Sequence, residues 1–418
     1  EKKASPPKNK PITDIFASVV KSKNGSEYCQ VVFTVKDEFF PKKMPLMFGH
    51  PTAHNMAVRK WKKITTKWGS PSRQRFYLGM SQIGNPNQRL LWMRYRWLMP
   101  DDMPARVLRL LDLGNVVEDD LIKKLRKIPG AQIFDLASNG KQFETEALGG
   151  HVKGHIDGVG QNFPGIDTKD PFLLEFKTAN DNRFKNLLKL GSYCEWSEEY
   201  AAQLHLYMGL FKFTQCIAIV YNKNNSDLYT EIIQYDSSAF DSLIEKAKNI
   251  LLAETPPDNY IPETDYRIKS YMTPGQQACY LGRGLMPEIH CRSCRFAKVD
   301  IEKGDAHWHC SQHDRKISED RQAKGCSRHN FIPELIPAHA IEKDDDMVLY
   351  EKDKIRFVNV AENFNTPGEN FFSSKELIEV VNSGFPEDIL ETCEKVKKLF
   401  NGASIKEIRP WVETRPST

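Results

Sequence analysis

Apolar and polar positions alternate along the chain in two ways, at helical and at strand-like spacing, which predicts an α/β protein. Apolar residues recur at helical spacing from Pro104 to about Lys127, and the segment Ile128-Pro129-Gly130 then ends this helix. The strand-like segments that follow lie at 132–137, 141–147, 151–159 (HVKGHIDGV) and 172–178 (FLLEFKT). Later elements are a helix over 197–211, strands over 216–222 and 228–236, and a helix over 238–252.

Composition and pattern together divide the chain of 418 residues into five segments, with two or three structural units. The expected segments are a disordered basic lead (1–12), an N-terminal region with no assigned role (13–98), an α/β core (99–285), a Cys-rich module (286–335) and a small C-terminal α/β appendage (336–418). The appendage is expected to contain a strand-like run near 349–360 and a helix beginning near Ser374.

The charge and the hydropathy of the chain indicate where the protein is located and which kinds of partner it can bind. The net charge is +4, a mild basic excess that is compatible with a nucleic-acid partner without establishing one. No apolar run approaches the roughly 18–20 residues that a membrane helix needs, and the basic start is not followed by the apolar stretch of a secretory signal. We therefore expect a cytoplasmic protein without a membrane partner.

A basic stretch with interleaved tryptophans lies between Arg59 and Arg75, where seven Lys or Arg occur without an acidic residue. Cations that meet phosphates and rings that stack on bases are combined in surfaces that bind single strands. The candidate DNA-binding residues are Arg59, Lys60, Trp61, Lys62, Lys63, Lys67 and Trp68. A solvated basic helix with its tryptophans packed inward explains the same pattern equally well.

The main candidate site consists of Asp157, Glu175 and Lys177. If FLLEFKT is a strand, Glu175 and Lys177 share one face, and an adjacent strand ending at Asp157 would bring a second carboxylate beside them. Two carboxylates and a backbone carbonyl, for which Phe176 is the candidate, are hard oxygen ligands for Mg2+. The alternative is a surface strand with an incidental Glu-x-Lys.

Three flanking features favour the site. Glycines surround the acid in Gly154-His155-Ile156-Asp157-Gly158, where a metal and a DNA backbone need close approach. Gln203 and Tyr207 are four residues apart on a predicted helix and thus on one face. Gly114 and Glu118 are also four apart; we expect the glycine to let its helix approach the sheet and Glu118 to complete the metal site, whereas the alternative is a solvated acidic turn.

In this order, G-x-x-x-E, G-H-I-D-G, E-F-K and Q-x-x-x-Y resemble the PD-(D/E)xK nucleases, in particular the RecB-like and lambda-exonuclease-like members of phages and prophages. The resemblance covers about 104–255, with Ile156 where the family name places proline and a long link between Asp157 and Glu175. It implies a restriction-endonuclease-like core, a mixed sheet flanked by helices. It also implies Asp157 and Glu175 as ligands of Mg2+ or Mn2+, Lys177 as the catalytic lysine, and roles for Glu118, Gln203 and Tyr207.

The function implied by the resemblance is a metal-dependent deoxyribonuclease, with exonuclease action in recombination or replication in a bacterial or phage-infected cell. A recombination or replication protein and a second copy of the chain are further partners that it allows. The alternatives are a non-catalytic DNA-binding or scaffold protein on the same fold, and a zinc-ribbon adaptor for a protein partner.

A cysteine cluster forms the second candidate site. Cys291 and Cys294 form a C-x-x-C knuckle, and Cys310 and Cys326 follow, with His329 as a substitute ligand. This set suits a closed tetrahedral zinc site with a structural role, while four thiolates could also hold an iron–sulfur cluster. The iron–sulfur arrangement of RecB-like nucleases would need Cys29 or Cys194 as an upstream ligand.

Overall fold

The structure is a computed structural model that describes residues 14–21, 27–34, 44–47, 75–99, 105–166, 168–258, 288–301, 306–352, 355–362 and 371–382. The chain divides into two compact units. In the first unit, three strands pair in an antiparallel sheet of order β1-β2-β3. These strands are β1 (Asp14–Lys21), β2 (Glu27–Thr34) and β3 (Met44–Met47).

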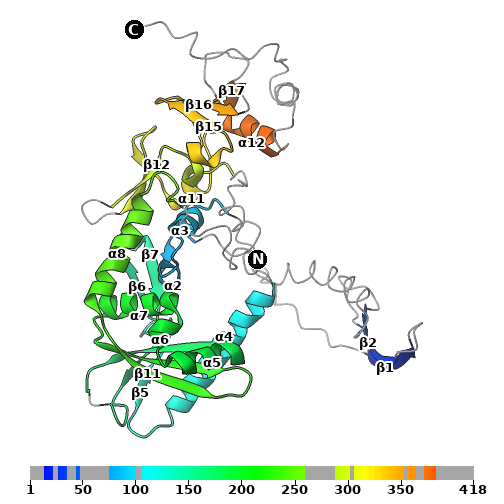
Figure 1. Ribbon diagram of the computed structural model, residues 1–418, viewed down its shortest axis with the longest axis vertical. Coiled ribbons are helices and arrows are strands. Elements are labelled where there is room, and N and C mark those ends of the chain that lie inside the picture. Colours follow the sequence, from blue (N-terminus) through cyan, green and yellow to red (C-terminus); the bar gives the residue numbers. More distant parts are fainter. Residues whose placement is uncertain are drawn as a thin grey trace, which may run out of the picture. The chain divides into compact units, whose positions relative to one another are not determined.

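The second unit contains the predicted α/β core, built on a five-stranded mixed sheet of order β11-β10-β9-β8-β5 (Figure 1). Its strands are β5 (Gln132–Phe134), β8 (Gly158–Gln161), β9 (Phe172–Ala179), β10 (Gln215–Asn222) and β11 (Leu228–Gln234). Only the central pair β9 and β10 is parallel, and the other neighbours in this sheet are antiparallel. The predicted mixed sheet is confirmed.

Each face of this sheet has its own apolar core, because side chains alternate along β9. On one face, Leu121 and Ile122 of α4 (Ala105–Leu125) join a cluster with Leu174 and Phe176. On the other face, Leu173 belongs to the large core that α7 (Glu198–Phe211) and α8 (Ser237–Leu252) complete. The helices α4, α7 and α8 occur where the sequence predicted them.

Side-chain caps explain where the helices begin. The side chain of Asn180 accepts a hydrogen bond from Arg183 N at the start of α5 (Asp181–Leu190), and Ser192 does the same for α6 (Tyr193–Trp196). Gly191 ends α5 in the left-handed conformation that glycine adopts without strain. Helices α5 and α6 are absent from the sequence prediction, although Asn180 and Gly191 are ordinary start and stop signals.

Residues 75–98, which the sequence left in a region without a role, belong to the same large core. They form β4 (Leu78–Gly79), α2 (Met80–Ile83) and α3 (Gln88–Tyr95). Strand β4 pairs with β7 (Val152–His155), which pairs in turn with β6 (Glu144–Ala147). This second sheet holds the segment that leads into Asp157.

The Cys-rich module shares the large core through Ala297, Val299 and Trp308. Its strands, β12 (Ala297–Asp300), β13 (His307–Cys310) and β14 (Arg315–Lys316), form an antiparallel sheet. The C-terminal region contains a sheet and helix α12 (Ser374–Asn382), and the strand-like run predicted near 349–360 forms two antiparallel strands in place of one. Its strands are β15 (His339–Lys343), β16 (Met347–Lys352), β17 (Ile355–Val360) and β18 (Phe371–Ser373).

Within the described ranges, no helix combines the length and the apolar character needed to cross a membrane.

Candidate active site

Strand β9 presents Glu175 and Lys177 on one face of the central sheet, as the alternation predicted. Their neighbours Leu174 and Phe176 point to the opposite face and pack in the cluster with α4. Glu175 is fully buried, and Lys177 is mostly buried. Because a charged carboxylate in such a position is costly without compensation, this arrangement differs from an incidental surface Glu-x-Lys.

Asp157 lies beside β9 because the chain leaves one sheet and enters another at this point, a break that the sequence did not predict. The prediction of one continuous strand over HVKGHIDGV was wrong: β7 ends at His155, Ile156 and Asp157 lie between strands, and β8 begins at Gly158 in a different sheet. The antiparallel register pairs Gly158 with Leu174, which places Asp157 next to β9. There the Phe176 N–H donates a hydrogen bond to Asp157 Oδ2 over 2.8 Å.

The charges of this group are only partly balanced. Lys177 Nζ forms an ion pair with Glu175 Oε1, whereas the buried Glu175 Oε2 has no hydrogen-bond partner in the structure. Burial and, to a lesser extent, the charge of Asp157 together raise the pKa of Glu175 to about 7, against the opposing effect of Lys177. Burial alone would lower the pKa of Lys177, but the charges of Glu175 and Asp157 outweigh burial and raise it. Lys177 is therefore the fixed cation of the site.

Glu118 of α4 is a third carboxylate, which interacts electrostatically with Asp157 and Glu175. Burial raises the pKa of Glu118 to about 8, and the charges of Asp157 and Glu175 contribute to the rise. Its neighbours Asp119 and Asp120 are exposed, and Asp120 forms an ion pair with Lys124 over 2.7 Å. The alternative interpretation, a solvated acidic segment, therefore fits the exposed Asp119 and Asp120 but not the half-buried Glu118.

Gln203 and Tyr207 of α7 lie on one face of the helix, as predicted, and both are buried. Gln203 Nε2 donates a hydrogen bond to Tyr207 Oη over 3.3 Å. Burial raises the pKa of Tyr207, and the charge of Glu175 raises it further. Gln203 and Tyr207 are therefore a buried, hydrogen-bonded pair, and Tyr207 is close enough to Glu175 to be affected by its charge.

Two of the glycines singled out in the sequence differ in what surrounds them. A Cβ atom on Gly154 would lie 2.6 Å from Tyr207 Cε1, so this glycine makes room for the tyrosine. A Cβ atom on Gly114 would meet nothing within 4 Å. The prediction that Gly114 lets its helix approach the sheet is wrong, because no packed atom faces that position.

We expect Gly154→Ala to lower the free energy of unfolding by about 1–3 kcal/mol and to slow catalysis, because the added methyl group displaces Tyr207. The matched control Gly114→Ala is expected to raise stability by about 0.5–1 kcal/mol, since alanine is the better helix former. Thermal unfolding of the two variants beside the wild type measures both effects. Equal stability of Gly154→Ala and the wild type would contradict this packing.

An aromatic and cationic group beside Lys177 escaped the sequence analysis. Lys177 Nζ lies 5.2 Å from the ring centre of Tyr200, and Arg183 Cζ lies 4.7 Å from that of Trp196. Tyr193 is fully buried with no hydrogen-bond partner for its hydroxyl. These residues come from α5, α6 and the start of α7. Because α5 and α6 were not predicted, their side chains were not recognised as neighbours of Lys177.

The donor set fits a divalent metal such as Mg2+. Glu118, Asp157 and Glu175 supply hard oxygens, and the unpartnered Glu175 Oε2 is the kind of buried acceptor that a cation would satisfy. Among the described residues, no three His, Cys, Asp or Glu side chains are already gathered as a metal-binding group. The metal ligands of both candidate sites accordingly remain predictions.

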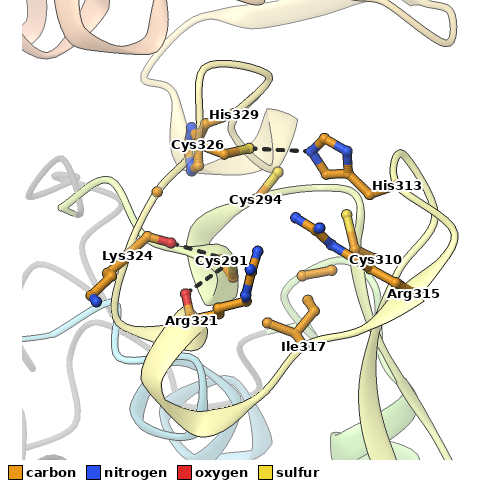
Figure 2. Close-up of a pocket in the computed structure, with 12 residues that line it drawn as sticks. Cys291, Cys294, Cys310, His313, Arg315, Ile317, Arg321, Lys324, Cys326 and His329 are labelled. Carbon is orange, nitrogen blue, oxygen red and sulfur yellow. Dashed lines mark hydrogen bonds between the residues drawn. The ribbon is translucent and has the colours of Figure 1, made fainter.

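The cysteine cluster lines a single cavity. Cys291, Cys294, Cys310 and Cys326 surround it together with His313 and three basic residues (Figure 2). The predicted substitute ligand His329 borders the same cavity, but its two ring nitrogens lie 3.1 Å from Ser293 Oγ and 2.9 Å from Ser374 Oγ.

The remaining predicted positions lie elsewhere. The basic stretch from Arg59 to Trp68 falls outside the described residues. Cys194, one of the two upstream cysteines considered for an iron–sulfur cluster, lies in α6 and does not line the cavity. Cys29 lies in β2 of the first unit.

No known family model matches the sequence, and no curated protein sequence matches it either. Among solved structures, similarity is found to an alkaline exonuclease, LHK-Exo, from Laribacter hongkongensis. The match has 14% identity and a TM-score of 0.32, and covers 46% of this chain and 90% of that one. LHK-Exo in complex with dAMP matches at 14% identity and a TM-score of 0.33, over 43% of this chain and 87% of that one. Similarity at this level does not establish a function, which has to be argued from the site.

Proposed function

We propose that the chain is a divalent-metal-dependent deoxyribonuclease that hydrolyses phosphodiester bonds. The observation that carries this proposal is the group of Asp157, Glu175 and Lys177 on β9 and beside it, in which Lys177 pairs with one oxygen of the buried Glu175 and the other oxygen has no partner. Glu118 interacts electrostatically with both acids. When ionised, three carboxylates and one ammonium group carry an excess of negative charge, and the raised pKa values of Glu118 and Glu175 reflect the cost of this charge. A divalent cation is the simplest group that balances this charge.

Each residue has a role that follows from its place in the site. Asp157 and Glu175, with Glu118 and the carbonyl of Phe176, would hold Mg2+ or Mn2+. When bound, such an ion lowers the pKa of a water molecule and offsets charge on the reacting phosphate. Lys177 Nζ is held between Glu175 and the ring of Tyr200, from where it can orient a nucleophilic water or stabilise the developing negative charge.

The hydrogen-bonded pair of Gln203 and Tyr207 is suited to positioning. Tyr207 is held by Gln203 and packs where Gly154 leaves space, so its hydroxyl has a defined location near Glu175. A phenol fixed in this way can orient a phosphate oxygen or a water molecule by hydrogen bonding.

DNA as the substrate, exonuclease action and a place in phage-type recombination or replication are the finer parts of the proposal. They are supported by the order of the four motifs around Glu118, Asp157, Lys177 and Tyr207, which resembles that of phage-type PD-(D/E)xK nucleases. The basic, tryptophan-containing stretch between Arg59 and Arg75 is the proposed DNA contact.

A non-catalytic DNA-binding or scaffold protein would not need this charge arrangement. Keeping Glu175 fully buried with an unpartnered oxygen costs on the order of 1–3 kcal/mol, which a protein without a metal could avoid by an amide or an apolar residue. The intact set of acids and lysine therefore favours the enzyme over the scaffold.

Calorimetric titration of the full chain with Mn2+ tests the metal site independently of catalysis. We expect the wild type to bind Mn2+ and Asp157→Asn to bind it at least about tenfold more weakly, since one anionic ligand is lost. Asp120→Asn is the matched control, because this exposed acid on α4 lies outside the site. Equal Mn2+ affinity of Asp157→Asn and the wild type would remove Asp157 from the metal site.

Labelled linear and circular DNA then separate the modes of action. We expect digestion of the linear form and persistence of the circle, because an exonuclease needs an end. Cleavage of the circle would replace exonuclease by endonuclease action. DNA binding without cleavage of any form, with either Mg2+ or Mn2+, would favour the non-catalytic alternative.

A further inference from the structure

The four thiols of the Cys-rich module are brought to one cavity by backbone pairing, although they come from three separate segments. Cys291 begins the short 3-10 helix η2 (Cys291–Ser293), and Cys294 directly follows it. Cys310 pairs with Ala297, three residues beyond Cys294, in the ladder of β12 and β13. An isolated bridge joins Cys294 to Phe331, so the chain that follows Cys326 is tied to the knuckle as well.

The surroundings of the cavity suit several thiolates at once. Arg315, Arg321 and Lys324 line it beside the cysteines, and such cations offset negative charge. As a thiol, Cys291 Sγ lies 3.3 Å from the carbonyl oxygens of Arg321 and of Lys324 and donates toward them (Figure 2), contacts that it would exchange for the metal as a thiolate. The cavity thus combines four soft sulfur donors with nearby positive charge, and both are features of a thiolate metal site.

We propose that Cys291, Cys294, Cys310 and Cys326 bind one structural zinc ion. Four thiolates complete the tetrahedral coordination of zinc and leave no open position, so the site has no catalytic role. Four thiolates and Zn2+ carry a net negative charge, for which the neighbouring arginines and lysine provide compensation. His313 Nε2 lies 3.7 Å from Cys326 Sγ, where it supports a thiolate as a hydrogen-bond donor.

The histidine alternative is disfavoured by the contacts of His329. Both of its ring nitrogens lie within hydrogen-bond distance of serine hydroxyls, those of Ser293 and Ser374. His329 therefore links the knuckle to α12, and it would have to leave both serines to bind a metal.

The zinc ion would fix the segment from Cys291 to Cys294, whose Arg292 side chain packs into the large core of the second unit. Arg292, between the first two cysteines, is fully buried and donates hydrogen bonds to Tyr95 O over 2.5 Å and to Phe76 O over 2.9 Å. The hydroxyl of Tyr95 lies 2.5 Å from His151 Nδ1, next to strand β7, which leads to Asp157. Loss of zinc is therefore expected to destabilise the Cys-rich module and, through Tyr95 and His151, the position of Asp157.

Zinc content of the purified full chain tests the proposal. By elemental analysis we expect about one zinc ion per chain in the wild type and a large loss of zinc in Cys291→Ser and Cys310→Ser. Cys194→Ser is the matched control, a half-buried thiol outside the cavity, and it should retain its zinc. Retention of full zinc content by Cys291→Ser and Cys310→Ser would overturn the assignment.

A titration of the wild type covers the case in which the serine variants do not fold. Stepwise addition of an organomercurial reagent should release zinc, followed with a metallochromic indicator, as the clustered thiols are blocked. Wild-type protein that contains no zinc and takes up none when its thiols are reduced would contradict the proposal. Protein that contains iron and sulfide with visible colour would replace zinc by an iron–sulfur cluster.

Discussion

Replacing Lys177 by glutamine is expected to slow DNA cleavage by about a hundredfold to a thousandfold while leaving divalent-metal binding in place. The ammonium group of Lys177 pairs with Glu175 and lies over the ring of Tyr200, and its pKa is raised by the charges of Glu175 and Asp157. A glutamine retains a hydrogen-bond donor toward Glu175 but removes the positive charge. The loss of rate therefore reports on that charge and not on the fold.

The measurement compares the initial cleavage rate per folded molecule with Mn2+ affinity in the same preparation. Lys185→Gln provides the matched control, because this exposed lysine of α5 forms a surface ion pair with Asp181 over 2.7 Å. A cleavage rate of Lys177→Gln within about threefold of the wild type would contradict the catalytic role, which predicts an effect of at least two powers of ten.

The largest effect on stability is expected from Arg292→Met, with a loss of unfolding free energy on the order of 4 kcal/mol. The buried guanidinium donates to Tyr95 O, to Phe76 O and twice to Gln322 Oε1. Its Cζ atom also lies 4.0 Å from the ring centre of Trp97 and 4.9 Å from that of Trp308. Methionine fills part of the volume but leaves these buried acceptors without a donor.

Differential scanning calorimetry measures this loss, which we expect as a fall of about 5 °C in melting temperature for a unit of this size. Arg328→Met, at an exposed position of the same module, should change the stability by no more than about 0.5 kcal/mol. Coincident melting of Arg292→Met and the wild type would mean that this residue does not hold the module to the core.

The sequence predicted the sheet and the main helices because their signals are local. The alternation in FLLEFKT placed Glu175 and Lys177 on one face, and the helical period around Gln203 and Tyr207 placed these two on one face of α7. Both placements are confirmed: Leu174 and Phe176 pack with α4 on the face opposite Glu175, and Gln203 donates a hydrogen bond to Tyr207.

The failures concern features that depend on long-range packing. The break at Ile156 and Asp157 was missed, because β7 and β8 have the same local pattern but pair in different sheets. The packing of Tyr207 against Gly154 was not predicted, because the two residues are more than fifty positions apart in the sequence. The part played by Arg292 was invisible for the same reason: its acceptors at Phe76 and Tyr95 come from a segment for which no motif was recognised.

The most direct test of the central claim is the Mg2+-dependent release of nucleotides from end-labelled linear DNA by the wild type and by Asp157→Asn. The proposed metal site predicts that wild-type protein digests the DNA with Mg2+, that a chelator stops the digestion, and that Asp157→Asn loses at least about a hundredfold in rate. Equal digestion by the two proteins, or digestion by the wild type in the presence of the chelator, would contradict the account.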